Sequence, residues 1–144
     1  MDKANTMNSK FGKPLAVGDT LPPLTMPAIN RTTLALYAGA SGDHNPIHID
    51  LDFARKARMP DVFAHGMLSM AYLGRLLTNW VPQQKIRQFN ARFVGITHLG
   101  NLVHCSGKVV AQIEQDGEQL LKLEILAANQ YGETKILGDA LIAL

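Results

Sequence analysis

The fold is decided by the stretch HGMLSMAYLGRLLTNW, residues 65–80. Its apolar residues recur with a helical period and form two stripes. The first stripe is Leu68, Ala71, Tyr72 and Leu76, and the second is Met67, Met70, Leu73 and Leu77. Stripes on two sides predict a long helix that is buried nearly all round. Val81-Pro82 ends it, because proline cannot continue a helix.

The chain after this helix alternates with period two, which predicts strands. The first strand places Phe89, Ala91 and Phe93 on one face. The next two have their apolar positions at Val103, Cys105, Gly107, Val109 and Ala111, and at Leu121, Leu123, Ile125 and Ala127. Asp116-Gly117 between them is a strong hairpin signal. Gln130-Tyr131-Gly132 predicts a further turn, which leads into residues 135–144.

The residues before the long helix predict shorter elements. Asn30 or Thr32 can cap a short helix that stops near residues 39–42, and a helical turn is expected over residues 51–57. Residues 17–29 contain three prolines and predict irregular or edge-strand structure. A helical first half followed by antiparallel strands predicts an α+β domain, with the sheet wrapped around the long helix.

Composition bounds the class of protein. The chain has 144 residues, of which 47% are hydrophobic and 18% charged, and this composition excludes disorder as the main state. We expect a flexible polar leader over residues 1–13 and one domain over residues 14–144. The formal charge of +2 argues against nucleic acid and membrane surfaces as partners. The single Cys105 cannot form an internal disulfide and indicates a reducing, cytoplasmic compartment.

The stretch ASGDHNPIHID, residues 40–50, places a carboxylate and an imidazole on an ordered loop. Gly42 ends the preceding element, and Pro46 biases Asn45 away from the helical region. A carboxylate and an imidazole that converge on one water can divide its chemistry, because one group removes a proton while the other returns a proton to the substrate. We therefore take Asp43 and His48 as candidates for this work.

The start of the long helix predicts a complementary group. If the helix begins here, the Gly66 amide is unpaired and lies at the positive end of the helix dipole. Such an amide can stabilise an enolate oxygen, which forms when a proton is added next to a thioester carbonyl. The two segments together indicate addition or loss of water next to a thioester.

These two segments resemble the signature of the MaoC-like, (R)-specific enoyl-thioester hydratases. That pattern reads Gly-Asp-x-Asn-Pro-[Ile/Leu]-His, matched by residues 42–48, followed by His-Gly, matched by His65 and Gly66. The resemblance implies a hot dog fold and a homodimer or an oligomer of dimers, with the sheets joined edge to edge. It also implies Asp43 and His48 as the catalytic pair and Gly66 as the oxyanion amide.

The implied reaction is reversible hydration of a trans-2-enoyl thioester to an (R)-3-hydroxyacyl thioester. The acyl group is carried by coenzyme A or by acyl-carrier protein. The thioester carries its own activation, so no cofactor is required. Asn45, His65 and Ser69 are assigned to loop bracing or substrate contact, and His65 is expected to order the helix start. The chain departs from the family pattern at Gly74 and over residues 94–98, which concerns acyl-chain selectivity more than the reaction.

Three alternatives are weighed against this hypothesis. A metal site could draw on the cluster of Asp43, His44, His48, Asp50 and Asp52, but Pro46 prevents the helix that would align the two histidines, so no metal is expected. A hot dog thioesterase would usually need a carboxylate on the central helix, and residues 65–80 contain none. A non-catalytic hot dog subunit that binds acyl thioesters would be expected to lose the Asp/His pair.

Overall fold

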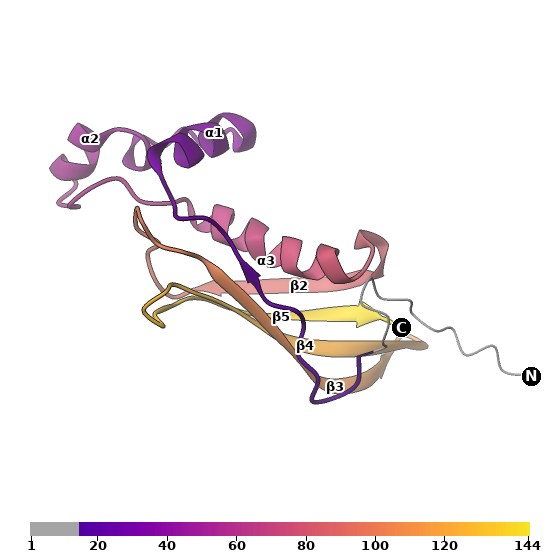
Figure 1. The fold of residues 1–144 in the computed structure, drawn as a ribbon. Helices are drawn as coiled ribbons and strands as arrows, with labels where there is room; N and C mark the ends of the chain where they lie inside the picture. Colours follow the sequence, from indigo (N-terminus) through magenta and orange to yellow (C-terminus); the bar gives the residue numbers. More distant parts are fainter. Residues whose placement is uncertain (1–14) are drawn as a thin grey trace, which may run out of the picture.

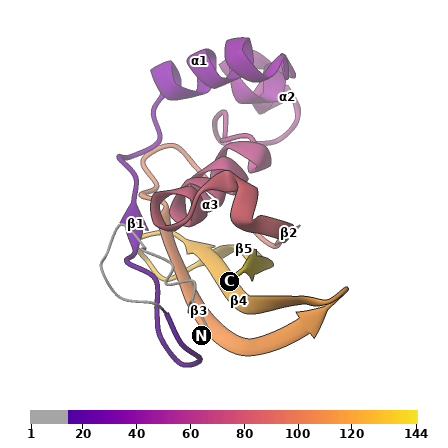
Figure 2. The same ribbon diagram turned by 90° about the vertical axis from the view of Figure 1, so that its right-hand side faces the viewer.

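The computed structural model describes residues 15–144, so the predicted leader, residues 1–13, lies outside the described residues. The elements in chain order are β1 (Leu24–Thr25), α1 (Arg31–Ser41), η1 (Pro46–His48), α2 (Leu51–Lys56), α3 (Gly66–Trp80), η2 (Gln83–Lys85), β2 (Ile86–Phe93), β3 (His104–Gln115), β4 (Glu118–Ala128) and β5 (Thr134–Ala143). One antiparallel sheet has the strand order β1-β3-β4-β5-β2. The predicted α+β architecture is confirmed: the sheet curls around α3, while α1 and α2 lie on the side of α3 away from the sheet (Figures 1 and 2).

The central helix buries one face against the sheet. Leu73, Leu76 and Leu77 are almost fully buried in the main core. The prediction that this helix is buried nearly all round is wrong, since Met67 is 53% exposed and Arg75 is also exposed. The sheet covers only one side of α3, and α1 and α2 stand over its N-terminal part alone (Figure 1). An apolar stripe shows that a face can be buried, but the neighbouring elements decide whether it is.

The β3–β4 hairpin follows the predicted turn. Asp116 and Gly117 have φ values of 52° and 77°, so both adopt the left-handed conformation that a two-residue hairpin turn of the primed type requires. The four predicted inward positions of β4 are all buried, from Leu121 to Ala127. On β3 the predicted alternation fails at Ala111, because a β-bulge shifts the register so that Ala111 pairs with the outward Lys122.

Two glycines lie at crowded positions of the curled sheet. Gly107 and Gly138 flank Ile125 in register on the neighbouring strands. A Cβ atom on Gly138 would lie 2.5 Å from the backbone oxygen of Asn90, and one on Gly107 would lie 2.7 Å from Leu21 Cδ1. Gly138 needs glycine, because the neighbouring atom belongs to the backbone of β2 and cannot move aside easily. At Gly107 the neighbouring atom is the end of the flexible Leu21 side chain, which can shift.

The first helix begins and ends at residues that the sequence indicates. Asn30, rather than Thr32, is the N-cap, and its side chain accepts a hydrogen bond from Thr33 N. Gly42 is the C-cap with a φ of 75°, and its N–H bonds to Ala38 O. Gly42 thereby turns the chain directly into Asp43. No helix within residues 15–144 is long and apolar enough to cross a membrane.

Candidate active site

The loop that follows α1 is held by its own side chains. Ser41 Oγ accepts a hydrogen bond from Asp43 N at 3.2 Å, and Asp43 Oδ1 accepts one from Asn45 N at 3.2 Å. Asn45 Oδ1 in turn accepts from Ile47 N at 3.1 Å, which caps the short helix η1. Such short-range bonds are typical of Asp, Asn and Ser, whose side chains can bond to nearby backbone N–H groups as the backbone does in a turn. They leave one Asp43 carboxylate oxygen without a hydrogen bond to this loop.

The orientation of His48 follows from one long-range hydrogen bond. Its Nδ1 lies 2.7 Å from the backbone oxygen of Phe63, and the Phe63 ring meets the imidazole edge-on. A carbonyl oxygen only accepts, so Nδ1 carries the proton and donates. In the neutral ring the lone pair is therefore on Nε2. His48 is buried, with 9% of its surface exposed, so the imidazole is well packed.

His65 braces the same loop from the start of α3. Its Nε2 donates to the backbone oxygen of Asp43 at 3.1 Å, and its ring stacks on His48 with 3.9 Å between the ring centroids. Tyr37 of α1 packs edge-on against its ring. Burial lowers the pKa of His65 below its ordinary value, and proximity to His48 lowers the pKa further, while the Asp43 carbonyl opposes the shift. The neutral imidazole is thus the favoured form.

His65 does not act as first expected at the helix start. It occupies the N-cap position of α3, yet its side chain makes no capping hydrogen bond. The imidazole reaches across to the Asp43 carbonyl instead. The expectation that His65 orders the helix start is wrong for the side chain, whose contacts are those of loop bracing.

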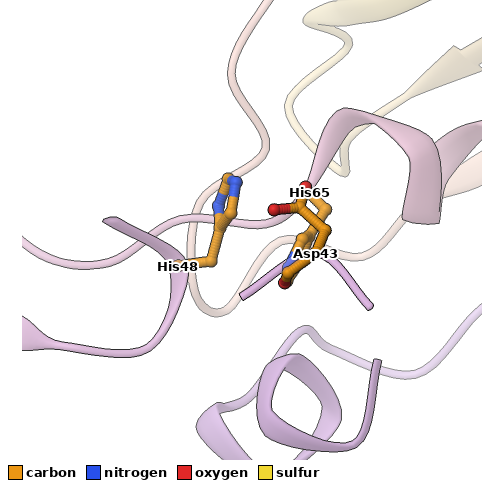
Figure 3. A group of neighbouring side chains, drawn as sticks. All are labelled: Asp43, His48 and His65. Atoms are coloured by element: carbon orange, nitrogen blue, oxygen red, sulfur yellow. The ribbon is translucent and has the colours of Figure 1, made fainter. Parts of the chain in front are cut away.

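The structure brings Asp43, His48 and His65 together. One carboxylate oxygen and one nitrogen from each imidazole all lie within 4.8 Å of one another. Figure 3 shows these side chains meeting between the loop and the start of α3. A single water-sized molecule placed among them can contact a carboxylate and an imidazole at once. The arrangement can therefore accept a proton from water and deliver one to a neighbouring carbon.

The same three residues lie close enough together to hold a metal ion, and one of them, His65, was not in the cluster considered from sequence. The two imidazole planes are inclined by only 27° and are stacked. A metal ion binds in the plane of each imidazole ring, about 2.0–2.1 Å from its nitrogen for zinc. Stacked rings direct their lone pairs side by side rather than at one point, so this geometry suits water better than a metal ion. The absence of a metal stays a prediction.

A cavity adjoins the start of α3. Gly66 is the first residue of the helix, so its amide has no acceptor within the helix. Gly66 and Ser69 line a cavity of about 170 Å³ between α3, the end of β2 and the following segment. Ser69 is buried, and its Oγ lies 3.4 Å from Thr97 Oγ1. The residue predicted to supply the oxyanion amide thus lines a cavity next to the start of α3.

Three residues shape this site although the sequence did not predict a role for them. The Phe63 carbonyl orients His48, Tyr37 packs on His65, and Thr97 pairs with Ser69. A backbone carbonyl has no sequence signature, so Phe63 could not have been found. Thr97 lies in the segment that departs from the family pattern, and this departure was the available signal. His44, part of the first metal hypothesis, is exposed.

Comparison with known proteins identifies relatives of this chain. The family described as "MaoC like domain" matches residues 16–127. The beta subunit of fatty acid synthase from Saccharomyces cerevisiae is 32% identical over 130 residues, which cover 88% of this chain and 6% of the yeast subunit. The chain therefore spans a small part of that relative. An (R)-specific enoyl-CoA hydratase from Rhodospirillum rubrum is 35% identical over 54 residues, 38% of each chain.

Solved structures share the architecture. The R-hydratase PhaJ1 from Pseudomonas aeruginosa, in its unliganded form, superposes with a TM-score of 0.77 at 26% identity. The match covers 90% of this chain and 82% of that protein. This likeness confirms the predicted hot dog fold.

Proposed function

The chain belongs to the family of MaoC-like domains, and on that premise we propose that it is a hydro-lyase acting on thioesters. It reversibly hydrates trans-2-enoyl thioesters to (R)-3-hydroxyacyl thioesters. The observation that carries this proposal is the convergence of Asp43, His48 and His65 within 4.8 Å. The names of two relatives, an (R)-specific enoyl-CoA hydratase and an R-hydratase, support the reaction and its stereochemistry.

Asp43 and His48 share one water in the proposed mechanism. The water oxygen bonds to C3 of the enoyl group as one of the two residues removes its proton. The other residue delivers a proton to C2, so the elements of water are added across the double bond. His48 suits this exchange because Nε2 carries the lone pair while Nδ1 is held by the Phe63 carbonyl. Both residues return to their starting state when the proton is passed back.

Gly66 supplies the electrostatic part of the mechanism. Attack at C3 moves negative charge onto the thioester oxygen, which becomes an enolate. The free amide at the start of α3 donates a hydrogen bond to that oxygen, and the helix dipole adds to the stabilisation. One donor of this kind contributes about 3–4 kcal/mol to lowering the barrier. The thioester supplies its own activation, so the proposal includes no cofactor.

The surrounding residues hold the pair in place. Asn45 braces the loop through its bond to Ile47 N, and His65 fixes the Asp43 backbone while supporting the His48 ring. Ser69 faces the adjoining cavity, where it can contact the substrate. The roles of Asn45 and His65 are positioning roles, because both act through the residues that touch the water, whereas Ser69 is proposed to contact the substrate itself.

The proposed substrate is carried by coenzyme A or by an acyl-carrier protein. We also propose a homodimer or an oligomer of dimers, since β2 stands at an edge of the sheet and its outer side can pair with a second copy. The single buried Cys105 supports a reducing, cytoplasmic setting, and burial raises the pKa of its thiol to about 12.

The first test is hydration of crotonyl-CoA by the purified protein. The reaction is monitored through the loss of the absorbance of the conjugated enoyl group. We expect (R)-3-hydroxybutyryl-CoA from the wild type by chiral analysis. Asp43→Asn and His48→Ala are each expected to lower kcat/KM by a factor of about 10³ or more, because each removes one of the two proton-transferring groups. Leu137→Ala, on the outer face of β5, is the folded control with unchanged kinetics.

Three outcomes would contradict this proposal. Activity that survives both Asp43→Asn and His48→Ala removes this site from the mechanism. Release of free coenzyme A, read with a thiol reagent, would indicate a thioesterase, although α3 carries no Asp or Glu. A wild type that is inert on acyl-CoA and acyl-carrier substrates, yet binds them, would indicate a non-catalytic subunit.

A further inference from the structure

The carbonyl that orients His48 belongs to a peptide group that is held at both ends. Phe63 O accepts a hydrogen bond from His48 Nδ1 at 2.7 Å. Ala64 N, which belongs to the same peptide group, donates to Thr97 O at 2.9 Å. A trans peptide group is planar, and its C=O and N–H point in opposite directions. The bond to Thr97 therefore fixes the direction in which the Phe63 carbonyl meets the imidazole.

The peptide group between Thr97 and His98 continues the series. Its oxygen accepts from Ala64 N, and its N–H donates to Asn101 Oδ1 at 3.0 Å. The three hydrogen bonds run in one direction, from the imidazole N–H through two peptide groups to the Asn101 amide oxygen. Phe63 and His98 also form an isolated antiparallel bridge, which keeps the two peptide groups side by side. Hydrogen bonds in such a chain polarise and strengthen one another.

Asn101 is firmly held where this chain of hydrogen bonds ends. It is buried, with 7% of its surface exposed. Its backbone N donates to His98 O at 3.1 Å, and its backbone O accepts from Ile29 N at 3.0 Å. The buried Asn129 donates from Nδ2 to the same Asn101 Oδ1 at 3.5 Å. These contacts come from separate segments, so the Asn101 oxygen has a fixed place against which the two peptide groups are oriented.

We propose that Asn101 is a positioning residue for the reaction. Through the two peptide groups, its side-chain oxygen holds His48 in the tautomer that carries the proton on Nδ1, which leaves the lone pair on Nε2 for the water. The proposal rests on the proposed function and adds to it a residue that touches neither the water nor the thioester.

The size of the expected effect follows from what a histidine tautomer decides. The hydrogen bond made by one ring nitrogen sets which nitrogen carries the proton. In a serine protease, loss of the residue that fixes the tautomer of the catalytic histidine lowers kcat by about 10⁴. Asn101 acts through two peptide groups that stay paired without it, so the loss should be smaller. Substrate binding should change little, because Asn101 does not line the cavity beside Gly66.

The first test is steady-state kinetics on two variants of Asn101. Asn101→Leu removes the acceptor at a similar volume, and should lower kcat about tenfold or more while KM stays within about twofold. Asn101→Asp keeps an acceptor oxygen and should retain kcat within about threefold. Asn79→Leu, at an exposed position near the end of α3, is the matched control and should leave both constants unchanged. Leu123→Ala, which loses stability in the main core, should keep its kcat per folded molecule.

The second test observes the His48 tautomer directly and does not depend on activity. Long-range 15N–1H spectra of labelled protein show which imidazole nitrogen carries the proton, and His48→Ala assigns the signals. Above neutral pH, the wild type should show His48 with the proton on Nδ1, and Asn101→Leu should gain a population with the proton on Nε2. If Asn101→Leu does not fold, Asn101→Asp takes its place. Its charged acceptor strengthens the chain and should move the Nδ1 proton signal downfield.

The outcomes separate this proposal from the proposed function. An unchanged tautomer and kcat in Asn101→Leu would overturn the positioning role, as would an unshifted Nδ1 proton in Asn101→Asp. A loss of kcat that Leu123→Ala reproduces would assign Asn101 to stability alone and also overturn it. A wild type without hydratase activity, in which the His48 tautomer still depends on Asn101, would contradict the proposed function while leaving the hold of Asn101 on His48 intact.

Discussion

The α1–α2 layer, residues 30–65, and the curled sheet with α3 are held together in different ways. In the α1–α2 layer, polar side chains bond to backbone groups two or three residues away, as Asn30, Asp43, Asn45 and Asp50 do. In the sheet, residues that are far apart in the sequence pair on neighbouring strands, as Gly107, Ile125 and Gly138 do. Local polar bonds place functional groups, whereas long-range apolar contacts provide most of the stability.

This difference teaches where substitutions should act. Asp43 is exposed and tied into a loop, so its replacement should change the chemistry and leave folding largely intact. Leu123 is fully buried on β4, so its replacement should change folding and leave the chemistry of folded molecules intact. Stability and activity measured on matched variants test whether the two effects are separate.

The largest effect on stability is expected at the centre of the sheet. Leu123→Ala should lower the free energy of unfolding by about 3 kcal/mol, because it leaves a cavity in the main core. Asp43→Asn should lower it by less than about 0.5 kcal/mol. Urea unfolding followed by circular dichroism measures both, and Leu137→Ala on the exposed face of β5 is the matched leucine control. Equal losses in the free energy of unfolding for Leu123→Ala and Asp43→Asn would contradict the proposed separation of stability from activity.

The next effect compares two glycines. Gly138→Ala should destabilise by about 2 kcal/mol, because the new methyl group collides with the backbone of β2. Gly39→Ala should stabilise by about 0.5–1 kcal/mol, since it lies in α1 with no atom near its Cβ direction and alanine favours helix. Thermal unfolding of both variants provides the measurement. A stable Gly138→Ala protein would mean that the sheet can relax its curl.

A smaller effect concerns pH and the loop-bracing histidine. The folded-state pKa of His65 is lowered by burial, so the unfolded chain binds the extra proton more readily. The stability that neutral His65 contributes is complete above the unfolded pKa, about 6.5, and is lost as the pH falls below it. Wild type should therefore lose more stability than His65→Gln between pH 7 and pH 5. Parallel pH profiles for the two proteins would show that His65 does not resist protonation.

The smallest effect is expected at the surface. Arg87 and Glu118 form an ion pair with Arg87 Nε 2.6 Å from Glu118 Oε1, and both side chains are about two-fifths exposed. Exposed pairs contribute little, because water screens them and their side chains lose freedom on pairing. Arg87→Met should leave the urea midpoint within the error of the measurement at low and high salt. A clear salt-dependent loss would show that this pair is a structural element.

Several features of the fold and site could be predicted because their causes are local. The period of residues 66–80 predicted α3, and Asp116-Gly117 predicted the hairpin. The spacing of Asp43 and His48 around Pro46 predicted one ordered loop. Each rests on backbone preferences or bonds among residues a few positions apart. The bulge near Val109 and the exposed flank of α3 escaped prediction, because they depend on how the sheet closes around the helix.

By itself, the sequence determined the elements, their caps and turns, and the pair of side chains placed on the loop. Only the tertiary structure decided how these groups meet. His48 bonds to a carbonyl 15 residues away, His65 reaches back 22 residues to Asp43, and Ser69 faces Thr97 across 28 residues. No local preference encodes such contacts, because they form only when burial of apolar surface in the sheet and α3 brings separate segments together.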